Sequence, residues 1–137
     1  CDIAIGSRLK HGAQVTGRSM GREILSRAYS VLFRLMFFTG FVDAQCGFKA
    51  LSRRVVTEVV PLVHDTGWFF DSELLILAEK NGYLIKEIPV DWTDDPDSRV
   101  KIISTSYRDI VGLLRLRTGG LKEASLRLGM NREQNED

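Results

Sequence analysis

The first third of the chain alternates short apolar runs with polar, glycine-rich segments. The isoleucines of residues 3–5 predict a short strand, which the following Gly-Ser turn ends. Residues 8–20 are rich in glycine and polar side chains and predict a loop. Over residues 22–38 apolar side chains recur at three- and four-residue steps. This period predicts an amphipathic helix, which we expect to end at Gly40.

The remaining pattern continues this alternation of strands and helices. The expected elements are a strand at 46–52, a helix at 53–63, a helix at 71–82, a strand at 84–92, a turn at 93–99 and a helix at 104–118. Residues 119–137 end in a polar run and predict a flexible tail or linker. Strands that alternate with helices in this way are typical of a layered α/β domain.

Composition and charge narrow the class of protein. With 137 residues, 44% hydrophobic and 27% charged, the chain has the make-up of one globular domain. Its net charge is +1, but residues 1–60 hold nine Lys/Arg and four Asp/Glu, and residues 61–137 hold ten and 14. A basic first half favours an anionic ligand or a membrane surface, although asymmetry of this size also arises by chance. A nucleic-acid partner is not expected, since the second half is acidic.

The cysteines and histidines do not predict a metal site. Cys1 and Cys46 are too few for a disulfide framework, and neither has metal-ligand spacing to His11 or His64. A second candidate metal cluster is the acidic run Asp94, Asp95 and Asp97. A turn built on Asp and Pro explains that run equally well, and it lacks the spacing of a calcium loop.

The helix expected at residues 22–38 has two interpretations. It carries too many charges and is too short to span a bilayer. It is either a buried core helix or a helix that lies on a membrane surface. In the second case, its arginines would be near the headgroups, and Phe37, Phe38 and Phe41 would reach the acyl boundary. Different faces of one helix can satisfy both interpretations.

Three residues of the first half suggest a phosphate site. Arg8 follows a strand and a turn, and Arg22 and Ser26 lie four residues apart near the start of the predicted helix. Guanidinium groups match phosphate oxygens bidentately, and a helix start favours anions. A solvated basic loop would give the same spacing, so the pattern alone leaves both possibilities open.

A second set of candidate site residues lies at the ends of predicted helices and strands. Asp43, Gln45 and Lys49 lie between a helix and a strand, where they could form a site or a turn. Asp71 and Glu73 open a helix, and capping of that helix explains them adequately.

Taken in order, several segments resemble one known family. They are DIAIGSR, REILSRAY, DAQCGFKALSR, FFDSELLILAEKNGYLIKEIPVDW and SRVKI. This series is similar to the second half of the polyprenyl-phosphate glycosyltransferases of glycosyltransferase family 2, and most of all to the dolichyl-phosphate glucose synthases. The resemblance covers roughly residues 2–117. Its most specific part is D-x-Q-C-G-F-K followed by F-D-x-E-L-L.

The resemblance implies a fold and a set of roles. It implies the C-terminal half of a three-layer, Rossmann-like GT-A fold, with residues 1–118 as its acceptor-side part and residues 119–137 as the tail. The expected acceptor-phosphate ligands are Arg8, Arg22, Ser26 and Arg99. The expected acids near the reaction are Asp43, Asp71 and Glu73, with Gln45 and Lys49 as further site candidates. Cys46 is expected only to pack.

The resemblance also implies a reaction and its partners. A hexose would pass from a nucleotide sugar to a polyprenyl or dolichyl phosphate on the cytoplasmic face of a membrane. The Mg²⁺ or Mn²⁺ ion of the family is bound by residues that precede this segment. We therefore expect the 137-residue chain to be a fragment that does not catalyse transfer by itself. The alternative is a non-catalytic module that retains the acceptor half and binds anionic lipids or phosphates.

Overall fold

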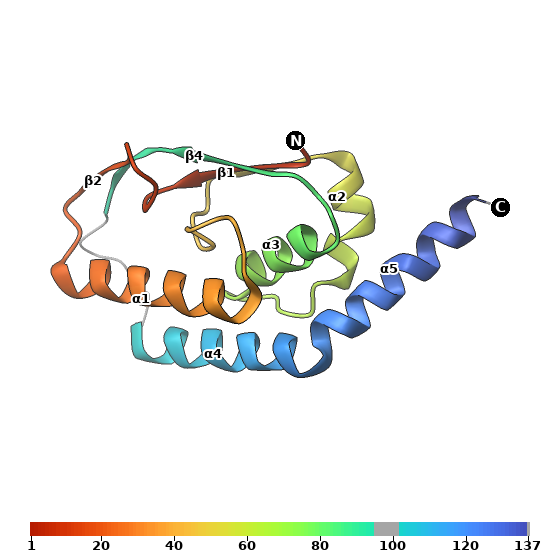
Figure 1. Cartoon of the computed structure of the whole chain (residues 1–137). Coiled ribbons are helices and arrows are strands. Elements are labelled where there is room, and N and C mark those ends of the chain that lie inside the picture. Colours follow the sequence, from red (N-terminus) through yellow and green to blue (C-terminus); the bar gives the residue numbers. More distant parts are fainter. Residues whose placement is uncertain (95–101, 137) are drawn as a thin grey trace.

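A computed structural model describes residues 1–94 and 102–136 of the chain (Figure 1). The strands are β1 (Ile3–Ser7), β2 (Gln14–Thr16), β3 (Lys49–Leu51), β4 (Ile85–Pro89) and β5 (Asp91–Thr93). The α-helices are α1 (Met20–Phe37), α2 (Arg53–Glu58), α3 (Phe70–Lys80), α4 (Ile102–Arg115) and α5 (Leu121–Glu136). A 3₁₀ turn (Val60–Leu62) follows α2, and a π-helical turn (Leu116–Gly120) joins α4 to α5.

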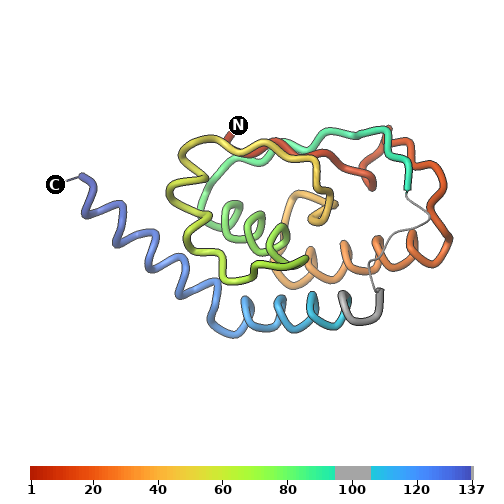
Figure 2. Tube along the Cα trace, turned by 180° about the vertical axis from the view of Figure 1, so that it is seen from behind, coloured from red at the N-terminus to blue at the C-terminus, as the bar shows by residue number. Residues whose placement is uncertain are grey.

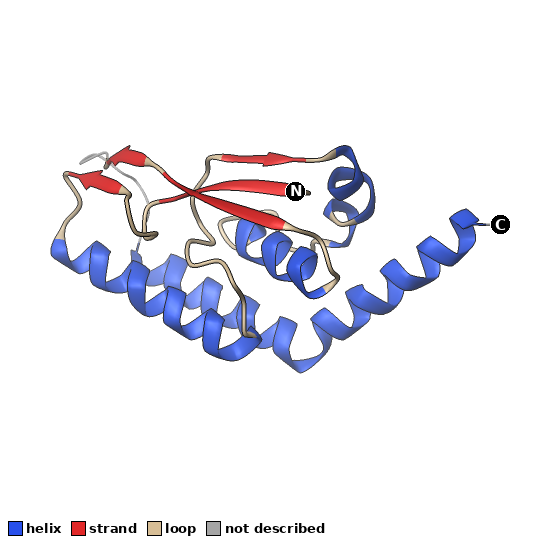
Figure 3. Ribbon diagram, turned by 45° about the horizontal axis from the view of Figure 1, so that its top comes forward, coloured by secondary structure: helices blue, strands red, loops and turns tan. Residues whose placement is uncertain are grey.

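The strands form two small sheets (Figure 3). In the first, β1 lies in the centre, antiparallel to β3 and parallel to β4. In the second, β2 pairs in parallel with β5. Along the chain, β2 follows β1 and β5 follows β4. The second sheet therefore pairs the segment after β1 with the segment after β4.

One face of the larger sheet is covered by helices. Figure 1 shows α1 and α3 below β1 and β4, and α4 runs beside α1 in Figures 1 and 2. Ile3 and Ile5 of β1 are buried together with Phe33 and Phe37 of α1. Helix α3 is buried from Ser72 to Ala78, which is why this segment is apolar almost all round. The core therefore lies between the sheet and α1, with α3 in its middle.

The predicted α/β class is confirmed, whereas the GT-A three-layer arrangement is not directly shown. The strand at 3–5 and the helices at 22–38 and 71–82 lie where the pattern placed them. In the part of the chain that is described, no helix covers the opposite face of the sheet (Figure 3). The strands differ in detail. The segment 84–92 is divided at Val90 into β4 and β5. The Val90 N–H donates to the carbonyl of Ser7 in β1, and the Val90 carbonyl accepts from the N–H of Gln14 in β2.

The C-terminal segment differs from its prediction. Residues expected to form a flexible tail instead form α5, whose Leu121, Ala124 and Leu128 pack against the core. These three positions are spaced three and four apart and form an apolar stripe that the polar composition obscures. The chain bends before this helix at Gly119, whose φ of 149° is one that residues with a Cβ rarely adopt.

A glycine also permits a close contact between α4 and the core. A Cβ atom built at Gly112 of α4 would lie 2.4 Å from Cδ1 of Phe69, and the Phe69 ring is fully buried. Helix α4 therefore approaches the core at this residue because no side chain is present there.

We predict that Gly112→Ala destabilises the protein by about 1–3 kcal/mol, the usual cost of overpacking a close contact. Urea unfolding measures the change. The matched control is Gly129→Ala in α5, where the new Cβ would meet nothing within 4 Å. That variant should be neutral or gain up to about 1 kcal/mol from helix propensity. Equal stability of the two variants would contradict the proposed contact.

Candidate functional site

The candidate site lies where β1 and β4 end. Because these strands are parallel, their carboxyl ends meet at one edge of the sheet. Arg8 follows β1 there, and β5 follows β4. The pairing of β2 with β5 then brings the chain before α1 to the same edge, where the N–H of Asp94 bonds to the carbonyl of Thr16 at 2.9 Å.

Arg8 and Asp43 form the central contact of this edge. Nε and Nη2 of Arg8 donate to the two carboxylate oxygens of Asp43, each at 2.9 Å, and the Arg8 backbone N–H donates to the same group at 2.9 Å. The Asp43 side chain is only 3% exposed. Burial alone would raise the pKa of Asp43, but the hydrogen bonds and charge of Arg8 outweigh it and hold that pKa below its usual range.

The loop that carries Asp43 is held from two further directions. The carboxylate of Glu87 on β4 accepts the backbone N–H groups of Val42 and Asp43, at 3.1 and 2.9 Å. Nε2 of Gln45 donates to Oδ2 of Asp109 on α4 at 2.7 Å. The loop is therefore fixed by a strand on one side and by a helix on the other.

A second acid holds two more arginines. Oδ2 of Asp94 lies 3.4 Å from Nε of Arg18 and 3.6 Å from Nη1 of Arg22, and Oδ1 accepts the indole N–H of Trp92 at 2.9 Å. The Arg8 guanidinium lies over the Trp92 ring, 5.4 Å from its centroid. Burial raises the pKa of Asp94, but the Trp92 hydrogen bond and the Arg18 charge outweigh this and lower it. One connected cluster thus contains three guanidinium groups and two carboxylates.

The structure brings some of the predicted site residues together and separates others. Arg8, Ser26, Asp43 and Gln45 line one small pocket, and Arg22 is joined to Arg8 through Asp94 and Trp92. The predicted phosphate ligand Arg99 lies outside the described residues, as do Asp95 and Asp97.

The predicted acids of α3 make other contacts. Oδ1 of Asp71 lies 2.7 Å from Nζ of Lys49, an ion pair without hydrogen-bond geometry. Glu73 is 1% exposed and accepts the backbone N–H groups of His64 and Asp65, each at 3.0 Å, and Nη2 of Arg115 at 2.8 Å. Through these bonds Glu73 joins the loop at His64 and Asp65 to Arg115 of α4. Its expected catalytic role stays a prediction.

The described residues do not form a metal centre. In residues 1–94 and 102–136 no group of three or more His, Cys, Asp or Glu side chains could hold an ion. Asp94, which the sequence offered as a metal candidate or turn residue, instead binds Arg18, Arg22 and Trp92. Cys46 is a buried free thiol, as expected.

Sequence reasoning missed Glu87 and Asp109. Each left a weak signal. Glu87 shares its strand parity with the inward-facing Ile85, and Asp109 lies four and seven residues before the buried Leu113 and Leu116. An acid on an otherwise buried stripe indicates a specific partner, since an unpaired buried charge is costly.

Exposed apolar side chains occur on α1, which also carries Arg22, and on α4. On α1 and its end they are Met20, Ile24, Val31, Leu35 and Phe38, and on α4 they are Tyr107, Ile110, Val111 and Leu114. Each set recurs at helical spacing, and all nine side chains are well exposed, with Leu35 at 68% and Phe38 at 82%. The two helices lie side by side in Figures 1 and 2. We call these nine residues the apolar face. No helix in the described part of the chain is long and apolar enough to cross a membrane.

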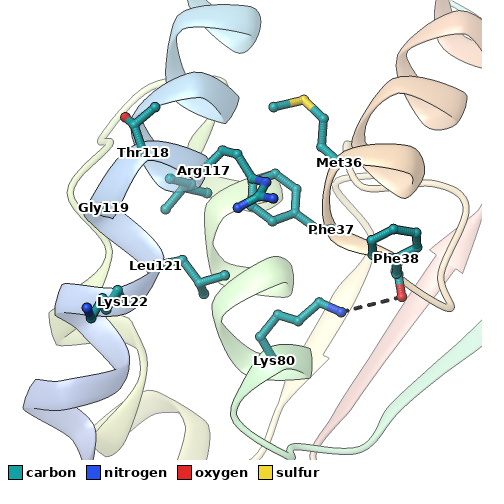
Figure 4. A pocket seen from close by; sticks show the side chains of 10 residues that line it. Met36, Phe37, Phe38, Lys80, Arg117, Thr118, Gly119, Leu121 and Lys122 are labelled. Carbon is teal, nitrogen blue, oxygen red and sulfur yellow. Dashed lines mark hydrogen bonds between the residues drawn. The ribbon is translucent and has the colours of Figure 1, made fainter.

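A groove of about 560 Å³ lies at the end of α1 (Figure 4). Its apolar lining includes Phe37, Leu116 and Leu121, and its basic lining consists of Lys80, Arg117 and Lys122. Nζ of Lys80 donates to the carbonyl of Phe38 at 3.4 Å. A groove with apolar and basic parts suits an anion attached to an apolar chain.

The chain is similar to several curated glycosyltransferases. It is 39% identical over 112 residues to the glycosyltransferase AglD of Haloferax volcanii, which covers 82% of this chain and 17% of the relative. It is 33% identical over 117 residues to the dolichyl-phosphate beta-glucosyltransferase of Saccharomyces cerevisiae, with 84% and 35% covered. The enzyme of the same name from Drosophila melanogaster is 38% identical over 100 residues, with 72% and 30% covered.

The chain thus spans about a sixth to a third of the length of these relatives. No protein-family model matches it, and no solved structure matches it.

We predict that Asp43→Ala lowers the free energy of unfolding at pH 7 by about 3–5 kcal/mol, because it leaves the Arg8 charge without its partner. Since the folded pKa of Asp43 is lowered, its contribution is complete above the unfolded pKa and is lost as pH falls through the folded pKa. The deficit of the variant should therefore shrink below about pH 4. Chemical unfolding at several pH values measures both effects.

The double variant Arg8→Ala/Asp43→Ala is the control for this pair. It should be less destabilised than the sum of the single variants, because no unpaired charge remains. Strict additivity would show that the two side chains do not depend on each other.

Proposed function

Since this chain is homologous over most of its length to a segment of the dolichyl-phosphate sugar synthases, glycosyltransferases that include the dolichyl-phosphate beta-glucosyltransferases, we propose that it is their acceptor-side part. Its protein would transfer a hexose from a nucleotide sugar to a polyprenyl or dolichyl phosphate. The observation that carries this proposal is the cluster of arginines, each held by an aspartate, together with the apolar face.

The chemistry of the reaction suits a cluster of this kind. A phosphate oxygen of the lipid attacks C1 of the hexose, and the bond from C1 to the nucleoside diphosphate breaks, so that the diphosphate leaves. The nucleophile is already ionised and needs no strong base. What it needs is orientation and charge balance, which fixed guanidinium groups supply.

The aspartates would position the arginines. Asp43 has a lowered pKa and uses both oxygens on Arg8, so it is poorly suited to take a proton. Asp43 occupies two of the three guanidinium nitrogens of Arg8, and the third, Nη1, makes no hydrogen bond to residues 1–94 or 102–136, so it would face a phosphate. Arg22 and Ser26 would complete the cradle, with Arg99 as a further ligand.

The membrane surface is the second proposed partner. The apolar face would enter the boundary between headgroups and acyl chains, while Arg27 and Arg34, which flank it on α1, stay near the headgroups. A lipid phosphate would then reach the arginine cluster without leaving the interface. Lys80, Arg117 and Lys122 would contact anionic headgroups at the other end of α1. The expected location is peripheral, at the cytoplasmic face.

The donor side of the reaction is proposed from the family alone. Mg²⁺ or Mn²⁺ would stabilise the leaving diphosphate, but the described residues offer no ligand set for it. Its ligands, together with the strands that would extend β3, β1 and β4 into a GT-A sheet, would come from other residues of the protein. The chain by itself is therefore proposed to be inactive.

The second candidate is a module that binds anionic lipids or phosphates without catalysis. It is favoured by the same arginines and the same apolar face, and it predicts the same binding. The two proposals differ in one result. A protein that contains this segment should form glycosylated polyprenyl phosphate under the first proposal and none under the second.

We predict that Arg22→Ala weakens binding to phosphatidylcholine vesicles that contain polyprenyl phosphate by about tenfold, since hydrogen bonds to charged groups are worth about 1.5–3 kcal/mol. Co-sedimentation with and without polyprenyl phosphate isolates the phosphate-dependent part. The matched control is Arg27→Ala, on the same helix, whose partner among the described residues is Glu23. If both variants retain full phosphate-dependent binding, Arg22 is not a ligand.

We predict that Leu35→Glu lowers partitioning onto the same vesicles by about tenfold, with or without polyprenyl phosphate, because a buried leucine side chain contributes about 1.5–3 kcal/mol. Arg34→Glu should also weaken association, through charge. The control is Val56→Glu, which adds the same charge at an exposed apolar position of α2. Equal losses for Leu35→Glu and Val56→Glu would argue against the apolar face as the membrane contact.

A further inference from the structure

Asp109 is the buried acid for which the proposed function has no task. It lies on α4, is 3% exposed, and occupies a helical stripe with the buried Leu113 and Leu116. Its Oδ2 accepts from Nε2 of Gln45 at 2.7 Å, whereas Oδ1 is buried without a hydrogen-bond partner within the described ranges.

This arrangement is costly for the fold. The pKa of Asp109 is raised to about 6. Burial is the main cause and the nearby charge of Asp65 adds to it, whereas the hydrogen bond from Gln45 opposes the rise. Burial raises the pKa of Tyr29 on α1, and the nearby charge of Asp109 raises it as well; the Tyr29 hydroxyl donates to Ser72. An asparagine could accept the same hydrogen bond without this cost. The presence of a carboxylate in place of an amide at this position therefore requires an explanation.

The reason lies in the direction of the hydrogen bond. An ionised carboxylate can only accept, so the amide of Gln45 must turn its NH₂ group toward α4. An asparagine could donate or accept and would leave either orientation of that amide open. A charge-assisted bond is also roughly twice as strong as a neutral one.

Gln45 also contacts the ion pair of Arg8 and Asp43. Its backbone N–H donates to Oδ1 of Asp43 at 3.3 Å, and Asp43 in turn holds the backbone and the guanidinium of Arg8. A continuous series of hydrogen bonds thus runs from α4 through Gln45 and Asp43 to Arg8.

We propose that Asp109 is a positioning residue, which fixes the loop of Asp43 and thereby the guanidinium of Arg8 through its hydrogen bond to Gln45. Because α4 also carries four of the nine residues of the apolar face, this series joins the membrane-facing side of the molecule to the phosphate cradle. That second statement rests on the proposed function, whereas the positioning itself does not.

The experiment is amide hydrogen exchange of the chain at pH 7, read by NMR. Asp109→Ala removes the acceptor, and the N–H groups of Arg8 and Gln45 that bond to Asp43 should exchange about tenfold faster. The N–H of Gly6, which bonds to the carbonyl of Phe48 in the same sheet, should not change. Asp109→Asn should restore part of the protection. Its global stability at pH 7 should equal or exceed that of the wild type, because the buried charge is gone.

Gln45→Ala completes a double-mutant cycle with Asp109→Ala. It should accelerate exchange at Arg8 as much as Asp109→Ala does, and the double variant should add nothing further. Tyr29→Phe removes the hydrogen bond to Ser72 and leaves the bond from Gln45 to Asp109 in place, so it should leave Arg8 unchanged. The proposal is wrong if Arg8 and Gln45 keep wild-type exchange in Asp109→Ala, or if every amide accelerates equally, as a purely structural role requires.

Vesicle binding tests the link to function separately. Asp109→Ala should lose several-fold of the phosphate-dependent binding and none of the partitioning onto vesicles without polyprenyl phosphate. Full phosphate-dependent binding by Asp109→Ala would overturn the link between Asp109 and the cradle. If the wild type shows no phosphate-dependent binding at all, the proposed function fails, and the exchange rates still decide the positioning role.

Discussion

The contact between Arg8 and Asp43 is the constraint on which the rest of the arrangement depends. A guanidinium at the end of a central strand is nearly buried, and it is tolerable only because a carboxylate meets it with both oxygens. Three neighbouring residues hold this pair in place. Glu87 holds the backbone of Asp43, Gln45 holds one of its carboxylate oxygens, and Trp92 covers the guanidinium.

The same principle recurs throughout the polar part of the molecule. Arginines are paired with acids before any ligand arrives, as in Asp94 with Arg18 and Arg22. Pairing lowers the freedom of these long side chains, so less entropy is lost when an anion binds. It also keeps the concentrated positive charge from repelling itself. A ligand phosphate would meet donors that already point in fixed directions.

The parts of this picture that were visible in the sequence are those with local periodicity. The strand at 3–5 and the helices at 22–38 and 71–82 were predicted because their apolar residues recur within a few positions. Glu87 and Asp109 were not found, because their partners lie 44 and 64 residues away. Helix α5 was predicted to be a tail, since only three of its apolar residues pack on the core and most of the others are polar. Arg8, Arg22 and Ser26 were chosen by type, spacing and resemblance, but the acids that orient them required three dimensions.

The pairing of β1 with β4 has a consequence for the order in which the chain folds. Ile3 pairs with Ile85, so the central strand finds its parallel neighbour only after some eighty intervening residues have been brought into place. Helices α1 and α3 need no such closure, because their hydrogen bonds are local. Closing a loop of this length is slow, and its entropic cost is offset only when the strands of the sheet have paired. We therefore expect the arginine cluster, which lies beyond the ends of both strands, to be among the last features to form during folding, after the apolar core that supports it.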